Sequence, residues 1–134
     1  MTGVQTCALP IWLILVKLLP EAKGWFVMPR GAGGLALTVL LAVVLAPIIE
    51  ELLFRGWIYT ALRARYSYVF VLLFTAGTFA VAHFERTGIY ALVVFPVGLV
   101  LGWMRERTGS VFSTMAMHAI YNGSAVLTKL LLPD

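Results

Sequence analysis

A run of nineteen residues, 31–49, contains no charged side chain. A helix needs about 20 predominantly apolar residues to cross a bilayer, so this run is typical of a membrane-spanning segment. The whole chain agrees with this interpretation, because 61% of its 134 residues are hydrophobic and only 12% are charged, whereas soluble domains carry about 25% charged residues. The sequence therefore predicts an integral membrane protein whose apolar surface contacts the lipid bilayer.

The net charge of +4 comes from basic residues that are scattered through the short segments between the apolar runs. A nucleic-acid-binding surface needs basic residues clustered in one patch or stripe, so nucleic acid is not expected as a partner. Scattered arginines and lysines suit anionic lipid headgroups better.

Four apolar segments predict an all-α, polytopic transmembrane helix bundle with about four spanning helices. We expect these helices at residues 34–62, 68–84, 89–104 and 110–132, separated by short polar turns. Pro47 lies inside the first segment, where it should kink the helix and free a backbone carbonyl. The charged segment 105–109 is expected to be a loop.

The first eleven residues, 1–11, resemble the in-frame translation of a common sequencing adapter, and we expect them to be an artefact. Residues 12–33 comprise a short apolar stub, too short to span a bilayer, and a polar loop. Residues 34–134 are expected to form the functional core. On this interpretation the chain is truncated at its N-terminus and lacks the helices that precede the core.

Two adjacent glutamates, Glu50 and Glu51, follow the uncharged run directly. Each charge inside a membrane costs about 2.5–3.5 kcal/mol on insertion scales, so their presence needs an explanation. Arg55 lies four residues after Glu51 on the same helix face, and the two can form an ion pair with a structural role. Glu50 is rotated by about 100° from Glu51 and has no local partner, so Glu50 is the candidate for proton transfer.

Two histidines lie in the predicted spans, and each has a structural as well as a catalytic interpretation. His83 follows Phe79 by four residues, but a lone intramembrane histidine is more often a satisfied core residue than a catalyst. His118 and Asn122 are also four residues apart and share one helix face, where both could donate hydrogen bonds to an oxyanion. Polar side chains that tie membrane helices together are common, and this alternative applies to Asn122 above all.

Helix length predicts that these polar residues lie at similar depth in the membrane. With a rise of 1.5 Å per residue, Glu50 and His83 are expected about 20–24 Å from the face at which residues 63–67 lie. His118 and Asn122 are expected about 12–18 Å from the same face, if the second turn on that side aligns with the first. Scattered core residues would not be expected to agree in depth, so a single polar site is predicted.

The order E-E-x-x-x-R from Glu50, F-x-x-x-H ending at His83 and H-x-x-x-N from His118, on successive apolar helices, resembles the CPBP family of intramembrane endopeptidases. This family comprises CAAX prenyl proteases and bacterial Abi-type relatives linked to bacteriocin processing and self-immunity. The resemblance covers nearly all of the expected core.

The resemblance implies a membrane-embedded endopeptidase. No serine or cysteine lies near a histidine in the motifs, so water is the expected nucleophile, and the adjacent glutamates are the one close pair of possible metal ligands, so no cofactor is expected. Glu50 and His83 would activate a water molecule for attack on a peptide carbonyl. His118 and Asn122 would stabilise the oxyanion. The remaining motif positions are Glu51, Arg55 and Phe79.

Three alternatives stay open. Glu50, His83 and His118 could instead hold a catalytic zinc ion with one open coordination position. A non-catalytic immunity or scaffolding protein could bind a peptide or partner protein in the same cavity, and a transporter fragment could use these residues as a proton relay. The expected partners are the lipid bilayer and a peptide or protein substrate, which could itself be associated with the membrane. The expected location is the bacterial plasma membrane.

Overall fold

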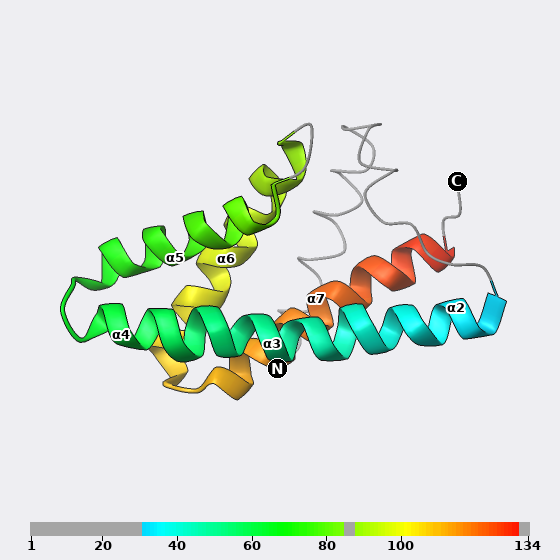
Figure 1. Ribbon diagram of the computed structural model, residues 1–134, viewed down its shortest axis with the longest axis horizontal. Coiled ribbons are helices and arrows are strands. Elements are labelled where there is room, and N and C mark those ends of the chain that lie inside the picture. The colour runs from blue at the N-terminus through cyan, green and yellow to red at the C-terminus, as the bar shows by residue number, and fades with distance from the viewer. Residues whose placement is uncertain (1–30, 85–87, 132–134) are drawn as a thin grey trace. The chain divides into compact units, whose positions relative to one another are not determined.

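The computed structural model describes residues 31–84 and 88–131, and every regular element within these ranges is a helix (Figure 1). The adapter-like residues 1–11 and most of the expected stub and loop, residues 12–30, lie outside the described residues. The described residues divide into two compact units, one formed by 31–45 and 119–131 and the other by 46–84 and 88–118. The prediction of an all-α fold is confirmed for the described part of the chain.

The first unit contains α2 (Gly31–Thr38), the π-helical segment η2 (Val39–Leu45) and the C-terminal part of α7 (Val111–Leu131). Hydroxyl groups on this part of α7 bond back to their own helix. Ser124 Oγ donates to Tyr121 O at 2.7 Å, and Thr128 Oγ1 donates to Ser124 O at 2.8 Å. Such internal bonds satisfy polar groups where no water is at hand, as a membrane helix requires.

One continuous helix runs from Gly31 to Arg63, as the apolar run predicts, but its hydrogen-bond register changes along the way. Pro47 offers a reason for the first change, because it has no N–H to donate to a carbonyl of the preceding turn. π-helical turns are rare in proteins, and many of those that occur lie at functional sites. After α2 and η2 the helix continues as α3 (Ala46–Glu51), the π-helical segment η3 (Leu52–Ile58) and α4 (Tyr59–Arg63).

In the second unit, α5 (Tyr68–Ala82) packs along α6 (Ile89–Thr108). Two glycines on one face of α6, Gly98 and Gly102, make this close approach possible. A Cβ atom at Gly98 would lie only 3.0 Å from the Cα of Ala76, so a larger residue would push the two helices apart. Small residues four positions apart are a common way for membrane helices to pack backbone to backbone.

The end of α6 lies further along the chain than the sequence predicts. Segment 105–109 was expected to be a loop, but the helix continues to Thr108, and Gly109 ends it with a φ of 65°. Arg105 helps to hold this last turn, because its Nε donates to Arg55 O at 3.1 Å. The loop prediction is wrong because a change in hydropathy marks the end of an apolar run and not the end of a helix.

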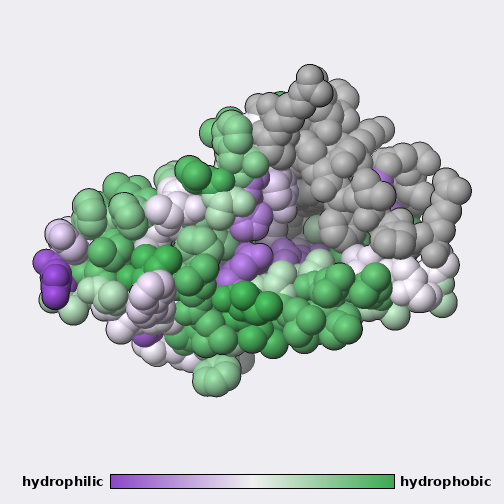
Figure 2. Space-filling model, viewed as in Figure 1, coloured by the Kyte–Doolittle hydropathy of each residue, from purple (hydrophilic) through white to green (hydrophobic). Residues whose placement is uncertain are grey.

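Two helices of the described part are long and apolar enough to cross a membrane, Gly31–Arg63 and Ile89–Thr108. α5 is apolar but shorter, and the predicted count of about four spans is not confirmed. Large apolar side chains are exposed on the described helices, including Trp57, Leu92 and Phe112, and apolar residues cover much of the visible described surface (Figure 2). Extended apolar surface of this kind is typical of contact with a membrane.

Candidate active site

Glu50 and Glu51 lie at the end of α3, between the two π-helical segments. Their environments differ, because Glu51 is fully buried whereas the side chain of Glu50 is 27% exposed. Successive residues of a helix are rotated by about 100°, so one carboxylate points into the helix packing and the other lies at its edge.

Glu51 and Arg55 form a fully buried ion pair, which confirms the pairing predicted from their spacing. Arg55 Nη1 lies 2.9 Å from Glu51 Oε1, and Arg55 Nη2 donates to the carbonyl oxygen of Gly98 at 3.0 Å. The guanidinium carbon lies 4.5 Å from the centre of the Phe79 ring, within the range of a cation–π interaction. Arg55 therefore ties η3 to both α5 and α6.

His118 is a second partner of Glu51. Its Nδ1 lies 3.0 Å from Glu51 Oε1, so this oxygen contacts both His118 and Arg55. An ionised carboxylate only accepts hydrogen bonds, so His118 Nδ1 donates to Glu51 and Nε2 points away from it. Glu51 thus orients the imidazole of His118, in addition to balancing the charge of Arg55.

His83 is the C-cap residue of α5, and two aromatic rings flank its side chain. Its Nδ1 lies 2.8 Å from Phe79 O, and a carbonyl oxygen only accepts, so Nδ1 carries the proton. The ring centres of Phe79 and Tyr90 lie 4.6 Å and 5.9 Å from that of His83. The ring is therefore held with Nε2 directed away from its own helix.

Glu50 lies where the two histidines converge. Its Oε2 is 3.7 Å from His83 Nε2 and 3.9 Å from His118 Nε2. This oxygen is buried and has no hydrogen-bond partner among the described residues. Glu51 Oε2 and Arg55 Nε are likewise buried without a hydrogen-bond partner among the described residues. Buried polar atoms are nearly always hydrogen-bonded in folded proteins, so three such atoms in one cluster call for water molecules or a functional role there.

Phe79 connects the parts of this cluster. Its ring contacts Phe54 edge-on, with centres 5.1 Å apart, and it lies 5.7 Å from the ring of His118. With Phe54 and Val94 it forms a buried apolar cluster in the second unit. The motif position F-x-x-x-H thus supplies both the carbonyl that orients His83 and the ring against which Arg55 and both histidines lie.

Two residues near the site were not singled out from the sequence. Gly98 accepts a hydrogen bond from Arg55 through its backbone, and a backbone acceptor leaves no signal in side-chain chemistry. Tyr90 lies beside His83, yet an aromatic residue at the start of an apolar helix is also typical of a membrane interface. The proximity of Gly98 and Gly102 in sequence was a usable signal for the close packing of α6.

Asn122 belongs to the first unit, one helical turn after His118 on α7. Its Nδ2 donates to Ala42 O at 2.7 Å. In the π-helical register the partner of Ala42 O would be residue 47, which is Pro47 and has no N–H. Asn122 therefore satisfies a carbonyl that the helix leaves without a donor, which is the tying role that competes with an oxyanion role.

The structure brings Glu50, His83 and His118 together in the second unit, with Glu51, Arg55 and Phe79 around them. Within residues 31–84 and 88–131, no group of three or more histidine, cysteine or acidic side chains is arranged to hold a metal ion. Zinc accepts N and O ligands of the kinds found in Glu50, His83 and His118. In the structure the Nε2 atoms of His83 and His118 lie 3.7 Å and 3.9 Å from Glu50 Oε2.

Comparison with known proteins extends these observations. An uncharacterized 24.3 kDa protein of Escherichia coli is 35% identical over 85 residues, which cover 61% of this chain and 39% of that protein. The chain thus spans about two fifths of the length of this relative. No solved structure matches the chain.

A family model described as type II CAAX prenyl endopeptidase, Rce1-like, matches residues 32–124. The match includes all three motifs, from Glu50 to Asn122, and the family is one of membrane proteases. The chain therefore belongs to the Rce1-like family of type II CAAX prenyl endopeptidases.

Proposed function

We propose that the chain carries the catalytic core of a membrane-embedded endopeptidase that hydrolyses peptide bonds with a water molecule activated by Glu50 and His83. The observation that supports this most directly is the buried, unpartnered Oε2 of Glu50, which faces the Nε2 atoms of both histidines. Glu51 Oε2 also lacks a hydrogen-bond partner among the described residues, but the side chain of Glu51 is fully buried whereas that of Glu50 is 27% exposed. Glu50 is therefore the carboxylate that a water molecule can reach.

The distances around Glu50 suit a shared water molecule. Separations of 3.7 Å and 3.9 Å are too long for direct hydrogen bonds, and polar groups at such distances are typically bridged by water. One water hydrogen would bond to Glu50 Oε2 and the other to the lone pair of His83 Nε2. The water oxygen would then present a lone pair to the carbonyl carbon of a bound peptide.

The reaction then balances with the residues of the site. Glu50 takes a proton from the water as its oxygen bonds to the peptide carbonyl carbon, and the carbonyl oxygen becomes an oxyanion. Glu50 returns this proton to the amide nitrogen, the carbon–nitrogen bond breaks, and a carboxylic acid and an amine leave. No serine or cysteine nucleophile is needed, and none occurs in the three motifs.

His118 and Asn122 are proposed to stabilise the oxyanion. His118 can donate at Nε2 only when both ring nitrogens carry protons, and in that form Nδ1 still donates to the carboxylate of Glu51 at 3.0 Å while the carboxylate of Glu50 lies 3.9 Å from Nε2. Asn122 follows one turn later on the same helix, and its Nδ2 has a second N–H beyond the one donated to Ala42 O.

Asn122→Ala is expected to lower kcat by about 10²–10³-fold with a much smaller change in KM, because an oxyanion donor acts mainly in the transition state. The matched control is Ser124→Ala, which removes a hydroxyl that donates to Tyr121 O within α7 and should leave kcat unchanged. The measurement is steady-state peptide cleavage, with the melting temperature of each variant. If Asn122→Ala lowers the melting temperature while the folded fraction keeps the wild-type kcat, Asn122 is a helix-tying residue only.

Chelation is expected to leave peptidase activity intact, because Glu50 and His83 activate the water without a metal ion in this proposal. The test combines metal analysis of the purified protein with cleavage assays before and after chelation. One zinc ion per chain, with activity lost on its removal and restored on its return, would instead assign Glu50, His83 and His118 as zinc ligands and the metal as the activator of the water.

The proposed substrate is a peptide or protein segment that reaches the site from the membrane, and the proposed location is the bacterial plasma membrane, in line with the relative from Escherichia coli. The test is to reconstitute the full-length protein in liposomes, supply membrane-anchored and soluble peptides, and identify products by mass spectrometry. Cleavage at a defined peptide bond is the expected result. A protein that cleaves none of them, yet confers immunity equally with and without Glu50, would contradict the proposal.

A further inference from the structure

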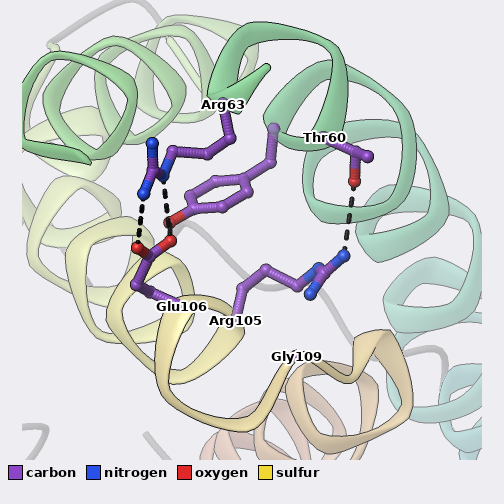
Figure 3. A pocket seen from close by; sticks show the side chains of 6 residues that line it. Thr60, Arg63, Arg105, Glu106 and Gly109 are labelled. Atoms are coloured by element: carbon purple, nitrogen blue, oxygen red, sulfur yellow. Dashed lines mark hydrogen bonds and ion pairs between the residues drawn. The ribbon is translucent and has the colours of Figure 1, made fainter. Parts of the chain in front are cut away.

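A polar pocket lies in the second unit, apart from the histidine cluster (Figure 3). It has a volume of about 320 Å³ and lies between α4 and the end of α6. Its lining differs from the surrounding apolar helix surface, because polar side chains and one glycine form it: Tyr59, Thr60, Arg63, Arg105, Glu106 and Gly109.

The position of this pocket matches the headgroup layer of a membrane. Both candidate spans, Gly31–Arg63 and Ile89–Thr108, end beside it. Aromatic side chains are exposed at the same ends, among them Trp103 at 48% and Tyr66 at 50%. Tryptophan and tyrosine are enriched where the hydrocarbon layer meets the lipid headgroups. The pocket therefore lies at the depth of the headgroups, and a lipid headgroup is the ligand we expect there.

The charge around the pocket is positive. Arg63, Arg65, Arg105 and Arg107 lie in the two helix ends, and Glu106 is the one acidic residue among them, which leaves a surplus of three positive charges. The C-termini of α4 and α6 subtract about half a charge each, and the N-termini of α5 and α7 at the same turns add about as much, so a surplus of about three remains. Hydrophilic residues are visible at the turn between α4 and α5 (Figure 2).

Glu106 accepts hydrogen bonds from Tyr59 and Arg63 but not from Arg105. It accepts from Tyr59 Oη at 2.6 Å and from Arg63 Nε and Nη2 at 3.1 Å and 2.8 Å. Arg105 instead donates from Nε to Arg55 O at 3.1 Å and from Nη2 to Thr60 Oγ1 at 3.3 Å.

These two bonds orient the Arg105 guanidinium, and Figure 3 shows the one to Thr60. They use only part of its donors, and Nη1 has no partner among the described residues. A planar guanidinium that is held in place with donors to spare matches the geometry of a phosphate group.

We propose that this pocket binds the phosphate group of an anionic phospholipid, with Arg105 as its anchor and Thr60 as a second polar contact. The surplus positive charge selects an anionic over a zwitterionic headgroup. The acyl chains extend along the exposed apolar surface of the adjoining helices. Free phosphate shares the headgroup chemistry but cannot use that apolar surface.

The test measures lipid retention by native mass spectrometry. Full-length protein is equilibrated in micelles that contain equal amounts of phosphatidylglycerol and phosphatidylcholine. Phosphatidylglycerol should be retained about 10-fold more than phosphatidylcholine, because basic residues near a membrane surface attract anionic headgroups. A parallel sample contains inorganic phosphate at millimolar concentration. Equal retention of both lipids would overturn the proposal, and so would displacement of phosphatidylglycerol by inorganic phosphate.

Three variants separate a binding pocket from a structural cluster. Arg105→Gln should abolish the preference for phosphatidylglycerol, whereas Arg65→Gln, the same charge change outside the pocket lining, should keep most of it. Glu106→Gln should increase retention several-fold, because it removes the only carboxylate of the pocket and releases Arg63. Equal losses in Arg105→Gln and Arg65→Gln would reduce the effect to general surface charge and contradict the proposal.

A further variant covers poor folding of Arg105→Gln, because Arg105 also supports Arg55 O. Arg105→Lys keeps the charge but lacks the planar fork, and it should retain less than a third of the wild-type phosphatidylglycerol. Wild-type retention by Arg105→Lys, or a loss of retention in Glu106→Gln, would overturn the assignment of Arg105 as the anchor.

Discussion

Arg55→Ala is expected to lower the free energy of unfolding by about 3–5 kcal/mol, which is typical when one partner of a buried ion pair is removed. Glu51 and Arg55 are both fully buried, so the variant leaves the Glu51 carboxylate in the helix packing without its counter-charge. The Gly98 carbonyl also loses its hydrogen bond from Arg55. The measurement is equilibrium unfolding in detergent micelles, followed by helical circular dichroism.

The matched control is Arg63→Ala, which breaks an ion pair of the same chemical type with Glu106. That pair is 2.8 Å long, but its side chains are 35% and 31% exposed, and exposed pairs contribute about 0–1 kcal/mol. The double variant Glu51→Gln/Arg55→Ala should recover part of the loss, because it removes the unpaired charge and keeps an acceptor for His118. A double variant no more stable than Arg55→Ala would contradict the pairing as the cause.

The helices could be predicted from the sequence because long apolar runs and short polar turns are local signals. The single helix through residues 34–62 was found in this way, and it extends over Gly31–Arg63. The two π-helical segments were not predicted, because the hydropathy of an apolar run does not distinguish α-helical from π-helical hydrogen bonding. Pro47 predicted a disturbance of the helix. The form of that disturbance depends on which backbone carbonyls accept a hydrogen bond from another part of the chain, as Ala42 O accepts one from Asn122.

The candidate site was predictable where its contacts are local in the chain. Glu51 and Arg55 are four residues apart and are paired, as helix geometry implies. The contact between Glu51 and His118 joins residues 67 positions apart, and nothing in their spacing specifies it. Equal depth in the membrane predicted that Glu50 and the histidines lie at one level, but not which nitrogen faces which oxygen. That detail depends on tertiary packing around Phe79.

Glu50→Gln is expected to lower kcat by about 10²–10⁴-fold, the range of general acid–base catalysis. Glutamine keeps the size of the side chain and an oxygen that can accept a hydrogen bond, but it cannot take a proton from water. The side chain of Glu50 lies at the edge of the packing, 27% exposed, and its Oε2 has no hydrogen-bond partner in the described part of the chain. The melting temperature and the peptide affinity should therefore change little.

The most direct test of this account is the ratio of kcat between wild type and Glu50→Gln, measured with the full-length protein in liposomes under saturating peptide. Melting temperatures within a few degrees of each other would show that both proteins are folded. The account predicts that the variant is at least about 100-fold slower while it binds the peptide as wild type does. A Glu50→Gln variant that cleaves the peptide at the wild-type rate would contradict the proposal that Glu50 activates the water.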